Sequence, residues 1–203
     1  YLTDNYKQML KDYPDTTFIF EYISKKDAHV VVYNEEQYGL NLIGARSEDS
    51  IFLTYKELKE SCDAFSIMLE SKGLSGAHVA VIGPTSFNWI VSYFGTAATG
   101  SVIVPLATSE TVEMNVKLID FADVDVLIFD SGNIPLYEEV RKMLPRVRLF
   151  ISVDDLCTDT DVLSFSHILK EYAGSYEKEP DGENTCAIMF TSGTTGFPKG
   201  VML

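Results

Sequence analysis

Short apolar runs alternate with helical patterns through most of the chain. The expected strands, which are rich in β-branched and aliphatic residues, are 78–82, 102–104, 126–129 and 149–153. The expected helices, in which apolar positions recur every three or four residues, are 55–69, 86–97, 109–122, 134–144 and 163–172. Such alternation predicts βαβ units. We therefore expect an α/β fold with a layered, largely parallel sheet flanked by helices.

Capping residues mark the ends of the first helices. Thr54 and Glu57 fit a capping box, in which the threonine hydroxyl and the glutamate carboxylate satisfy free backbone N–H groups. Gly73 and Gly100 follow the last apolar positions of two helices, where glycine commonly ends a helix. The expected helices therefore have local start and stop signals.

The first part of the chain has a different pattern. Residues 17–23 and 30–33 are dominated by β-branched and aromatic side chains, which predicts an extended β region near the N-terminus. Residues 34–50 are polar, contain glycine and show no clear period, so we expect a loop there.

Polar stretches precede a C-terminal apolar segment. Acidic residues gather over 154–161 without the glycine and final glutamate of a calcium loop, so we expect a solvated loop. Residues 174–184 are predicted to be a linker, followed by a strand at 185–190 and a new strand opening at 200–203. Because domains seldom stop as a strand opens, and because the chain begins with Tyr1, we expect the N-terminal part of a longer protein.

Composition narrows the class further. The 203 residues are 46% hydrophobic and 23% charged, which suits a globular core and excludes overall disorder. A net charge of -14 disfavours nucleic acid and anionic membrane as partners. No apolar run approaches the roughly 18 residues of a transmembrane segment. The odd, widely spaced cysteines, Cys62, Cys157 and Cys186, predict reduced thiols and a cytoplasmic location, and no metal-ligand pattern occurs.

Candidate chemistry is concentrated in residues 191–200. This stretch holds four hydroxyl side chains, three glycines and Lys199. Glycine lets backbone N–H groups approach a ligand, while hydroxyls and N–H groups donate to phosphate oxygens and lysine adds a positive charge. No Asp or Glu occurs over 184–203, although the chain is strongly acidic. The pattern predicts a phosphate-binding loop.

Two common phosphate motifs do not fit this loop. A Walker A loop has Ser or Thr directly after its lysine, whereas Gly200 follows Lys199 here. The spacing of Gly193 and Gly196 is also wrong for a dinucleotide-binding GxGxxG motif. A flexible, hydroxyl-rich turn between two strands is the weaker alternative, because such a turn needs neither this length nor a proline and a lysine together.

The loop resembles the signature sequence of the adenylate-forming enzymes, which include acyl-CoA synthetases, firefly-type luciferases and the adenylation domains of peptide synthetases. The family pattern is Tyr-Thr-Ser-Gly-Thr-Thr-Gly-x-Pro-Lys-Gly-Val. Residues 190–201 match every fixed position except the first, where Phe190 replaces tyrosine. We expect this loss of one hydroxyl to have little effect on the loop.

Upstream segments are similar to family motifs in the expected order. They are 53–58, 83–89 and 98–106, and the whole resemblance covers about residues 12–203. Ala98 departs from the family's lysine at that position. We expect these segments to be packing elements, with Tyr55 and Trp89 in the core.

The resemblance implies an enzyme that joins a carboxylic acid to ATP, releases pyrophosphate and passes the acyl group to a thiol, often that of coenzyme A. It implies phosphate contacts from Thr191, Ser192, Gly193, Thr194, Thr195 and Gly196, with Lys199 as a supporting charge. It also implies Mg²⁺, although no magnesium ligand is identifiable in the sequence. The adenine contacts, the metal-binding acid and a C-terminal domain with a catalytic lysine follow this loop in the family.

We therefore expect residues 1–203 to be the N-terminal part of an AMP-binding large domain, inactive alone. The flanking segments 187–190 and 201–203 favour an acyl-CoA synthetase acting on a fatty acid. Two alternatives stay open. One is a non-catalytic nucleotide-binding, pyrophosphate-binding or interaction module, which the intact motif disfavours, and the other is an adenylation domain of the peptide-synthetase or luciferase type.

Overall fold

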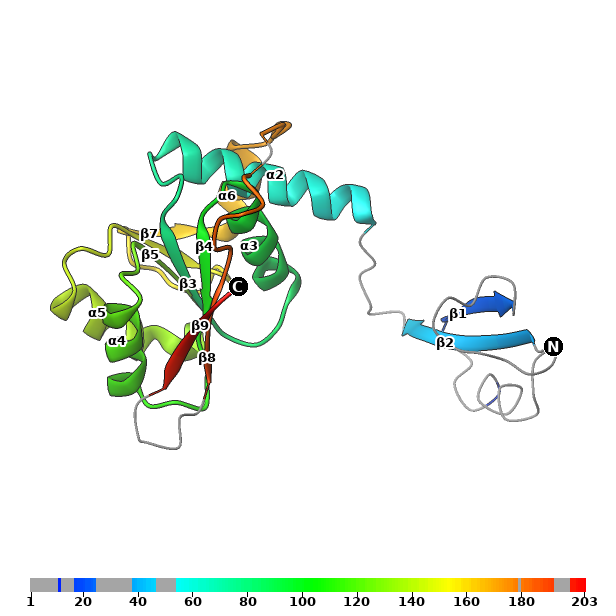
Figure 1. Cartoon of the computed structure of the whole chain (residues 1–203), viewed down its shortest axis with the longest axis horizontal. Helices are drawn as coiled ribbons and strands as arrows, with labels where there is room; N and C mark the ends of the chain where they lie inside the picture. Colours follow the sequence, from blue (N-terminus) through cyan, green and yellow to red (C-terminus); the bar gives the residue numbers. More distant parts are fainter. Residues whose placement is uncertain (1–10, 12–16, 25–37, 47–53, 179, 192–197) are drawn as a thin grey trace. The chain divides into compact units, whose positions relative to one another are not determined.

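The computed structural model describes the chain in segments that cover most of its length. They are residues 11, 17–24, 38–46, 54–178, 180–191 and 198–203 (Figure 1). The chain divides into two compact units, 1–53 and 54–203. None of the helices within these segments is both long and apolar enough to cross a bilayer.

The first unit contains an antiparallel strand pair. Strand β1 (Thr17–Ser24) pairs with β2 (Tyr38–Arg46), with a register irregularity between Ile19 and Phe20. The predicted strand at 17–23 is confirmed, while the one predicted at 30–33 lies outside the described residues. The loop expected over 34–50 is wrong where β2 runs. Tyr38, Leu40 and Leu42 alternate there with Gly39 and Asn41, so the two-residue period of a strand is present. The glycine and the asparagine are weak strand formers, which hid the strand in the sequence.

The second unit is built on a parallel sheet with the strand order β4-β3-β5-β6-β7. Its strands are β3 (His78–Ile82), β4 (Val102–Pro105), β5 (Val126–Phe129), β6 (Leu149–Ser152) and β7 (Val162–Ser164). The sheet order reverses between β3 and β5, because the chain moves outward to β4 and then returns to the other side of β3. The predicted parallel α/β fold is confirmed.

Helices cover both faces of this sheet. The layer on one face consists of α2 (Tyr55–Ser71), α3 (Phe87–Ala98) and α6 (Phe165–Glu171). The layer on the other face consists of α4 (Val112–Phe121) and α5 (Ile134–Met143), with a short 3₁₀ turn, η1 (Ser131–Asn133), leading into α5.

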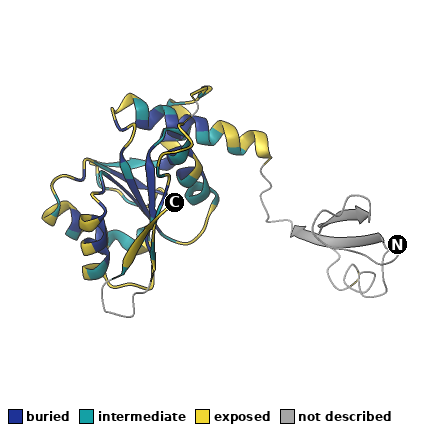
Figure 2. Ribbon diagram, viewed as in Figure 1, coloured by how far each residue is buried: buried dark blue, intermediate teal, exposed yellow. Residues whose placement is uncertain are grey.

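The core lies on both sides of the sheet (Figure 2). All four residues of β5 are fully buried, with Val126 and Ile128 packed in one layer and Leu127 and Phe129 in the other. Burial on both faces explains why this strand is an unbroken apolar run rather than an alternating one.

The predicted capping box of α2 is confirmed. The Thr54 hydroxyl accepts from the Glu57 backbone N–H at 3.2 Å, and the Glu57 carboxylate accepts from the Thr54 N–H at 2.7 Å. These hydrogen bonds also hold the pKa of Glu57 below its ordinary value, with the Thr54 backbone bond as the largest cause.

Tyr55 corrects a second expectation. Its side chain is 92% exposed, so its assignment to the core is wrong, whereas Trp89 packs partly buried against the core. The helical spacing through Tyr55 is real, but the buried part of α2 begins only near Asp63, and Figure 2 shows the first turns exposed. The spacing of apolar residues identified helix α2 and the face that it turns toward the core. It did not show that the core ends before the first turns of the helix.

Two predicted helices start later than expected. Thr111 caps α4, so the helix expected from residue 109 begins at Val112. The helix expected from Leu163 begins at Phe165, because Val162–Ser164 forms the edge strand β7 beside β6. The Ser164 hydroxyl accepts from the His167 N–H at 3.3 Å, which fixes the start of α6.

The acidic stretch 154–161 is a loop, as predicted, but it is anchored as well as solvated. Arg141 of α5 donates to Asp159 at 2.6 Å and also pairs with Asp161. The buried Tyr137 donates its hydroxyl to the same Asp159 carboxylate at 2.7 Å. The Asp161 N–H and this hydroxyl lower the pKa of Asp159, while burial and the carboxylate raise the pKa of Tyr137 to about 12.

Candidate phosphate-binding hairpin

The predicted phosphate loop connects the strands of a short antiparallel hairpin. Strand β8 (Ile188–Thr191) pairs with β9 (Lys199–Met202), with Thr191 opposite Lys199 at the end nearest the loop. The Thr191 hydroxyl lies 3.5 Å from the Lys199 carbonyl oxygen, at the limit of a weak hydrogen bond. At the other end, the Leu203 N–H donates to the Ala187 carbonyl at 2.9 Å. The two ends of the loop are therefore held side by side.

The hairpin begins at the edge of the parallel sheet. The Ile103 N–H of β4 donates to the Cys186 carbonyl at 3.0 Å, and Ile103 forms a parallel bridge with the fully buried Ala187. The chain thus covers the outer edge of β4 before it enters β8. Because β4 ends at Pro105, the hairpin lies near the carboxyl end of a parallel strand, where α/β sheets commonly bind ligands.

A small cavity of about 90 Å³ lies between this hairpin and the turn that follows β4. Its lining surface is about half polar and half apolar and is formed by Pro105, Leu106, Ala107, Glu110, Leu118, Phe190, Thr191 and Pro198. The cavity therefore touches both ends of the predicted phosphate loop. The residues contributed by the turn were not singled out in the sequence, although their place directly after a strand of a parallel sheet was a usable signal.

The structure describes two of the seven predicted phosphate contacts. Thr191 and Lys199 are exposed at the loop-proximal end of the hairpin. The other five lie outside the described residues: Ser192, Gly193, Thr194, Thr195 and Gly196. The structure therefore brings together the two ends of the predicted site.

The hairpin carries a positive charge that favours an anion, and the neighbouring cavity carries a negative charge that opposes one. Lys199 is the only charged residue in 184–203. Glu110, which lines the neighbouring cavity, is an exposed carboxylate on the other wall. A phosphate would therefore be favoured at the hairpin rather than deep in this cavity.

The described residues contain no preformed cluster of metal ligands. No group of three or more His, Cys, Asp or Glu side chains is placed there to hold a metal ion. Glu110 is the one carboxylate among the described residues that line the cavity beside Thr191. Magnesium at nucleotide sites is usually held by one or two carboxylates together with water and the substrate phosphates.

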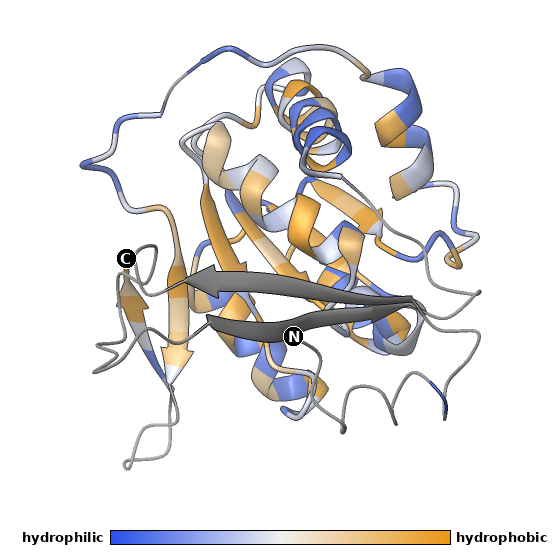
Figure 3. Ribbon diagram, turned by 90° about the vertical axis from the view of Figure 1, so that its right-hand side faces the viewer, coloured by the Kyte–Doolittle hydropathy of each residue, from blue (hydrophilic) through white to orange (hydrophobic). Residues whose placement is uncertain are grey.

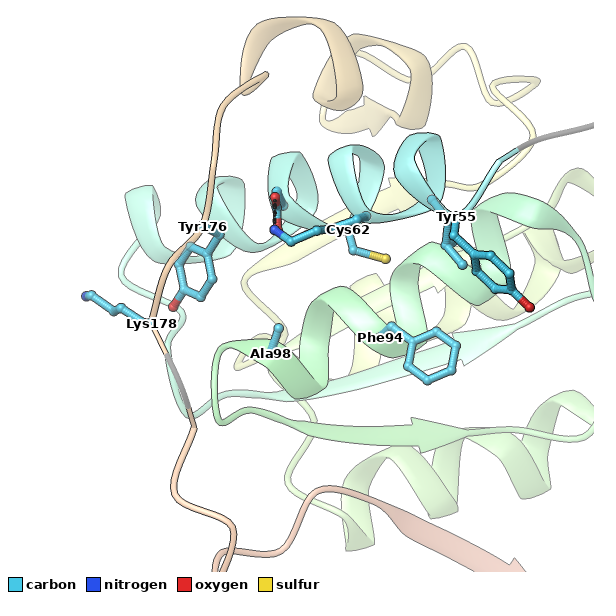
Figure 4. Close-up of a pocket in the computed structure, with 9 residues that line it drawn as sticks. Tyr55, Cys62, Phe94, Ala98, Tyr176 and Lys178 are labelled. Carbon is cyan, nitrogen blue, oxygen red and sulfur yellow. Dashed lines mark hydrogen bonds and ion pairs between the residues drawn. The ribbon is translucent and has the colours of Figure 1, made fainter. Parts of the chain in front are cut away.

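A larger, shallow groove of about 440 Å³ lies between α2 and α3 (Figure 4). Figure 4 shows Tyr55 and Phe94 at one end of it, and Tyr176 and Lys178 at the other. Cys62 lies in its floor, and burial raises the pKa of this thiol to about 11, so the group is a poor nucleophile at neutral pH. The groove offers apolar contact area and no reactive centre.

Comparisons with known proteins agree with this architecture. A family profile described as AMP-binding enzyme matches residues 25–203. The long-chain-fatty-acid–CoA ligase of Thermus thermophilus is 28% identical over 150 residues, which cover 73% of this chain and 27% of that ligase. Bacitracin synthase 1 of Bacillus licheniformis is 25% identical over 207 residues, which cover 100% of this chain and 3% of the synthase.

A solved structure shows the same fold. The adenylation domain of a carboxylate reductase from Mycobacterium chelonae superposes with a TM-score of 0.68 at 18% identity, covering 97% of this chain and 33% of that one. The chain therefore has the fold of that adenylation domain. Because the profile matches well over half of its length, the chain belongs to the AMP-binding enzyme family. The resemblance found in the sequence is confirmed, and the chain spans a third or less of each of these relatives.

Proposed function

We propose that this chain is the N-terminal part of an enzyme that activates a carboxylic acid with ATP and then forms an acyl-CoA thioester. The observation that carries the proposal is the anchored hairpin. It presents Thr191 and Lys199 at the two ends of a glycine- and hydroxyl-rich loop in a segment without carboxylates. Membership of the AMP-binding family supports the general reaction.

In this reaction a carboxylate oxygen attacks the α-phosphorus of ATP. The new bond is the acyl–phosphate bond of the adenylate, and the bond from the α-phosphorus to the bridging oxygen breaks, so pyrophosphate leaves with the electron pair. Charge therefore builds on the leaving oxygens. The loop's hydroxyl and N–H donors would hold the β- and γ-phosphates in line, and Lys199 would neutralise part of the departing charge.

A fatty acid is the proposed substrate class. The similarity to the Thermus long-chain-fatty-acid–CoA ligase supports it. The bacitracin synthase relative matches the whole length of this chain and favours a second candidate, an adenylation domain of the peptide-synthetase type. The two candidates share the adenylation step and differ in the acid and in the acceptor thiol.

Carboxylate-dependent exchange of labelled pyrophosphate into ATP tests the proposal. The assay uses the polypeptide that carries these 203 residues at the full length of its relatives, with fatty, aromatic and amino acids offered separately. Exchange with fatty acids supports the proposal, and exchange with amino acids alone favours the peptide-synthetase type. No exchange with any acid, while ATP still binds, would favour a non-catalytic nucleotide-binding module.

The 203 residues alone are proposed to be inactive. The 150 residues that match the Thermus ligase cover 27% of that enzyme, and the family resemblance implies that the adenine contacts and the metal-binding acid follow the loop. Acid-dependent release of AMP by the isolated chain would contradict this part of the proposal.

A further inference from the structure

Phe190 and Gly200 face each other across the hairpin, one residue before the pair that opens into the predicted loop. The Ala187–Leu203 pair exchanges backbone hydrogen bonds in both directions, at 3.3 and 2.9 Å. Hydrogen-bonded and non-hydrogen-bonded pairs alternate along an antiparallel ladder, so the Phe190–Gly200 pair is of the second kind. Side chains in such pairs approach most closely.

A side chain at Gly200 would meet two residues of β8. A Cβ added at Gly200 would lie 3.1 Å from Ile188 Cγ2, which is a tight contact, and 3.4 Å from Phe190 Cε1, which is ordinary van der Waals contact. Backbone conformation does not demand a glycine here, because Gly200 is not among the residues with positive φ. The glycine therefore leaves room for the Phe190 ring and Ile188 beside β9.

The same ring joins the hairpin to the body of the fold. Phe190 is partly buried against the core layer that contains α4. Its ring centroid lies 6.4 Å from that of Phe121 near the end of α4, with the two planes tilted by 57°. Met189 and Val201, on the opposite face of the hairpin, are 39% and 43% exposed. Figure 3 shows β8 coloured mainly as hydrophobic, whereas β9 passes from blue at its start to orange near the C-terminus.

We infer that Phe190 is a positioning residue for the phosphate loop, acting through Gly200. The ring is held by α4 on one side and covers β9 on the other, so it fixes how the hairpin leaves the core. Thr191 and Lys199 are the next pair along the hairpin, so their placement depends on the direction in which the hairpin leaves the core. A displacement of about 1 Å at a reacting group can cost about 10²-fold in rate. The contacts of the Phe190 ring therefore affect the reaction rate as well as stability.

This role rests on the proposed adenylation function, and the exchange assay separates the two. Phe190→Ala in the full-length protein should lower kcat by about tenfold to a hundredfold and raise the KM for ATP, while the KM for the acid stays unchanged. Phe190→Tyr keeps the ring and should retain wild-type values. Met189→Ala is the matched control, since it shortens a neighbouring side chain on the exposed face.

Gly200→Ala supplies a second, independent measurement. Alone it should slow exchange, because its methyl group would crowd Ile188 and touch the Phe190 ring. Combined with Phe190→Ala it should cost less than the sum of the two single changes, which is the signature of direct coupling. If Phe190→Ala proves too unstable to assay, Phe190→Leu keeps apolar contact with α4 while removing the flat ring.

The outcomes are distinct. A wild-type protein without carboxylate-dependent exchange would overturn the proposed function itself. Wild-type exchange together with a Phe190→Ala variant that matches Met189→Ala in both kcat and the KM for ATP would overturn the positioning role alone. A loss of melting temperature with an unchanged KM for ATP would also overturn it, because that is the result of a merely structural role.

Discussion

Thr191 and Lys199 are paired across the last rung of the β8–β9 hairpin, so the chain leaves and re-enters the hairpin at a single point. The Cys186 carbonyl ties the start of this hairpin to β4 of the parallel sheet. A loop built in this way can contribute several donors to one anion while its ends stay fixed. Under the proposed function, Thr191 and Lys199 would be held in place before the reaction, and donors held in this way stabilise developing charge without reorganising.

A loop hydroxyl should matter more for rate than for folding. Thr194→Ala in the full-length protein should slow adenylation by about 10²–10³-fold, the usual loss for one donor to a developing anion. Thr194→Ser keeps the hydroxyl and is the matched control. Equal exchange rates for the alanine variant and the wild type would remove Thr194 from the proposed site.

Gly95 of α3 allows close packing against α2. A Cβ at this position would lie 2.9 Å from Phe65 Cδ1, closer than real Cβ atoms approach, and 3.0 Å from the Cys62 carbonyl oxygen, which is a tight contact. Ser66 also donates to the Gly95 carbonyl at 2.9 Å, so the helices cannot separate without straining this bond. Gly95→Ala should therefore lower the free energy of unfolding by about 1–3 kcal/mol, measured by urea denaturation.

The control for this prediction is Gly182→Ala. A Cβ there would meet no atom within 4 Å, and Gly182 does not have a positive φ. Its effect should stay within about 0.5 kcal/mol. Equal stabilities for the Gly95 and Gly182 variants would show that the helices can separate freely.

The free energy of unfolding should fall as the pH is lowered, in part because of Asp154. Burial raises the pKa of this carboxyl, but hydrogen bonds from Ser131 and Leu156 outweigh it and leave the pKa below its ordinary value of 3.8. A lowered folded-state pKa adds stability above the ordinary value, and this stability is lost as the pH falls through the folded-state value. Asp154→Asn should therefore flatten the decline in unfolding free energy that begins below about pH 5 and continues as the pH falls past the ordinary value of 3.8.

Urea denaturation of both proteins across that range tests the sign. At neutral pH the Asp154→Asn variant should be less stable by about 1 kcal/mol, the usual net value of a hydrogen bond. An unchanged acid slope would show that the hydrogen bonds to Asp154 contribute no pH-dependent stability.

Arg141 should control local order in the acidic loop more than global stability. Its pairs with Asp159 and Asp161 are partly exposed, and such pairs contribute about 0–1 kcal/mol. Arg141→Gln should leave the melting temperature nearly unchanged and speed hydrogen exchange of the Asp161 amide, which donates to Asp159 at 3.0 Å. Lys142→Gln is the control, because Lys142 pairs within α5 instead. Equal exchange in the two variants would contradict an anchoring role.

Most of the fold could be predicted from local signals. The Thr54 capping box fixed the start of α2, and the unbroken apolar run at 126–129 identified a strand buried on both faces. The failures have physical causes. Strand β2 carries glycine and asparagine at alternate positions, and the edge strand β7 at 162–164 is short enough to resemble the first turn of the helix behind it.

The candidate site was only partly predictable. A local sequence pattern identified the loop that starts at Thr191, because glycines, hydroxyls and a lysine are contiguous there. The turn residues Leu106 and Glu110 share a cavity with Phe190 through tertiary packing. That relationship depends on where β8 meets β4, which no local pattern specifies. The exposure of Tyr55 also depends on tertiary packing, so the correct helical spacing of this residue did not predict it.

The central claim is that the loop between β8 and β9 serves carboxylate activation. Pyrophosphate exchange by the full-length protein, with Lys199→Ala beside Lys56→Ala, tests it most directly, because Lys56 is an 83% exposed lysine on α2. The account predicts exchange that depends on the acid, weakened about 10²-fold or more by Lys199→Ala and unaffected by Lys56→Ala. Equal exchange in the two variants, or none in the wild type with any acid, would contradict it.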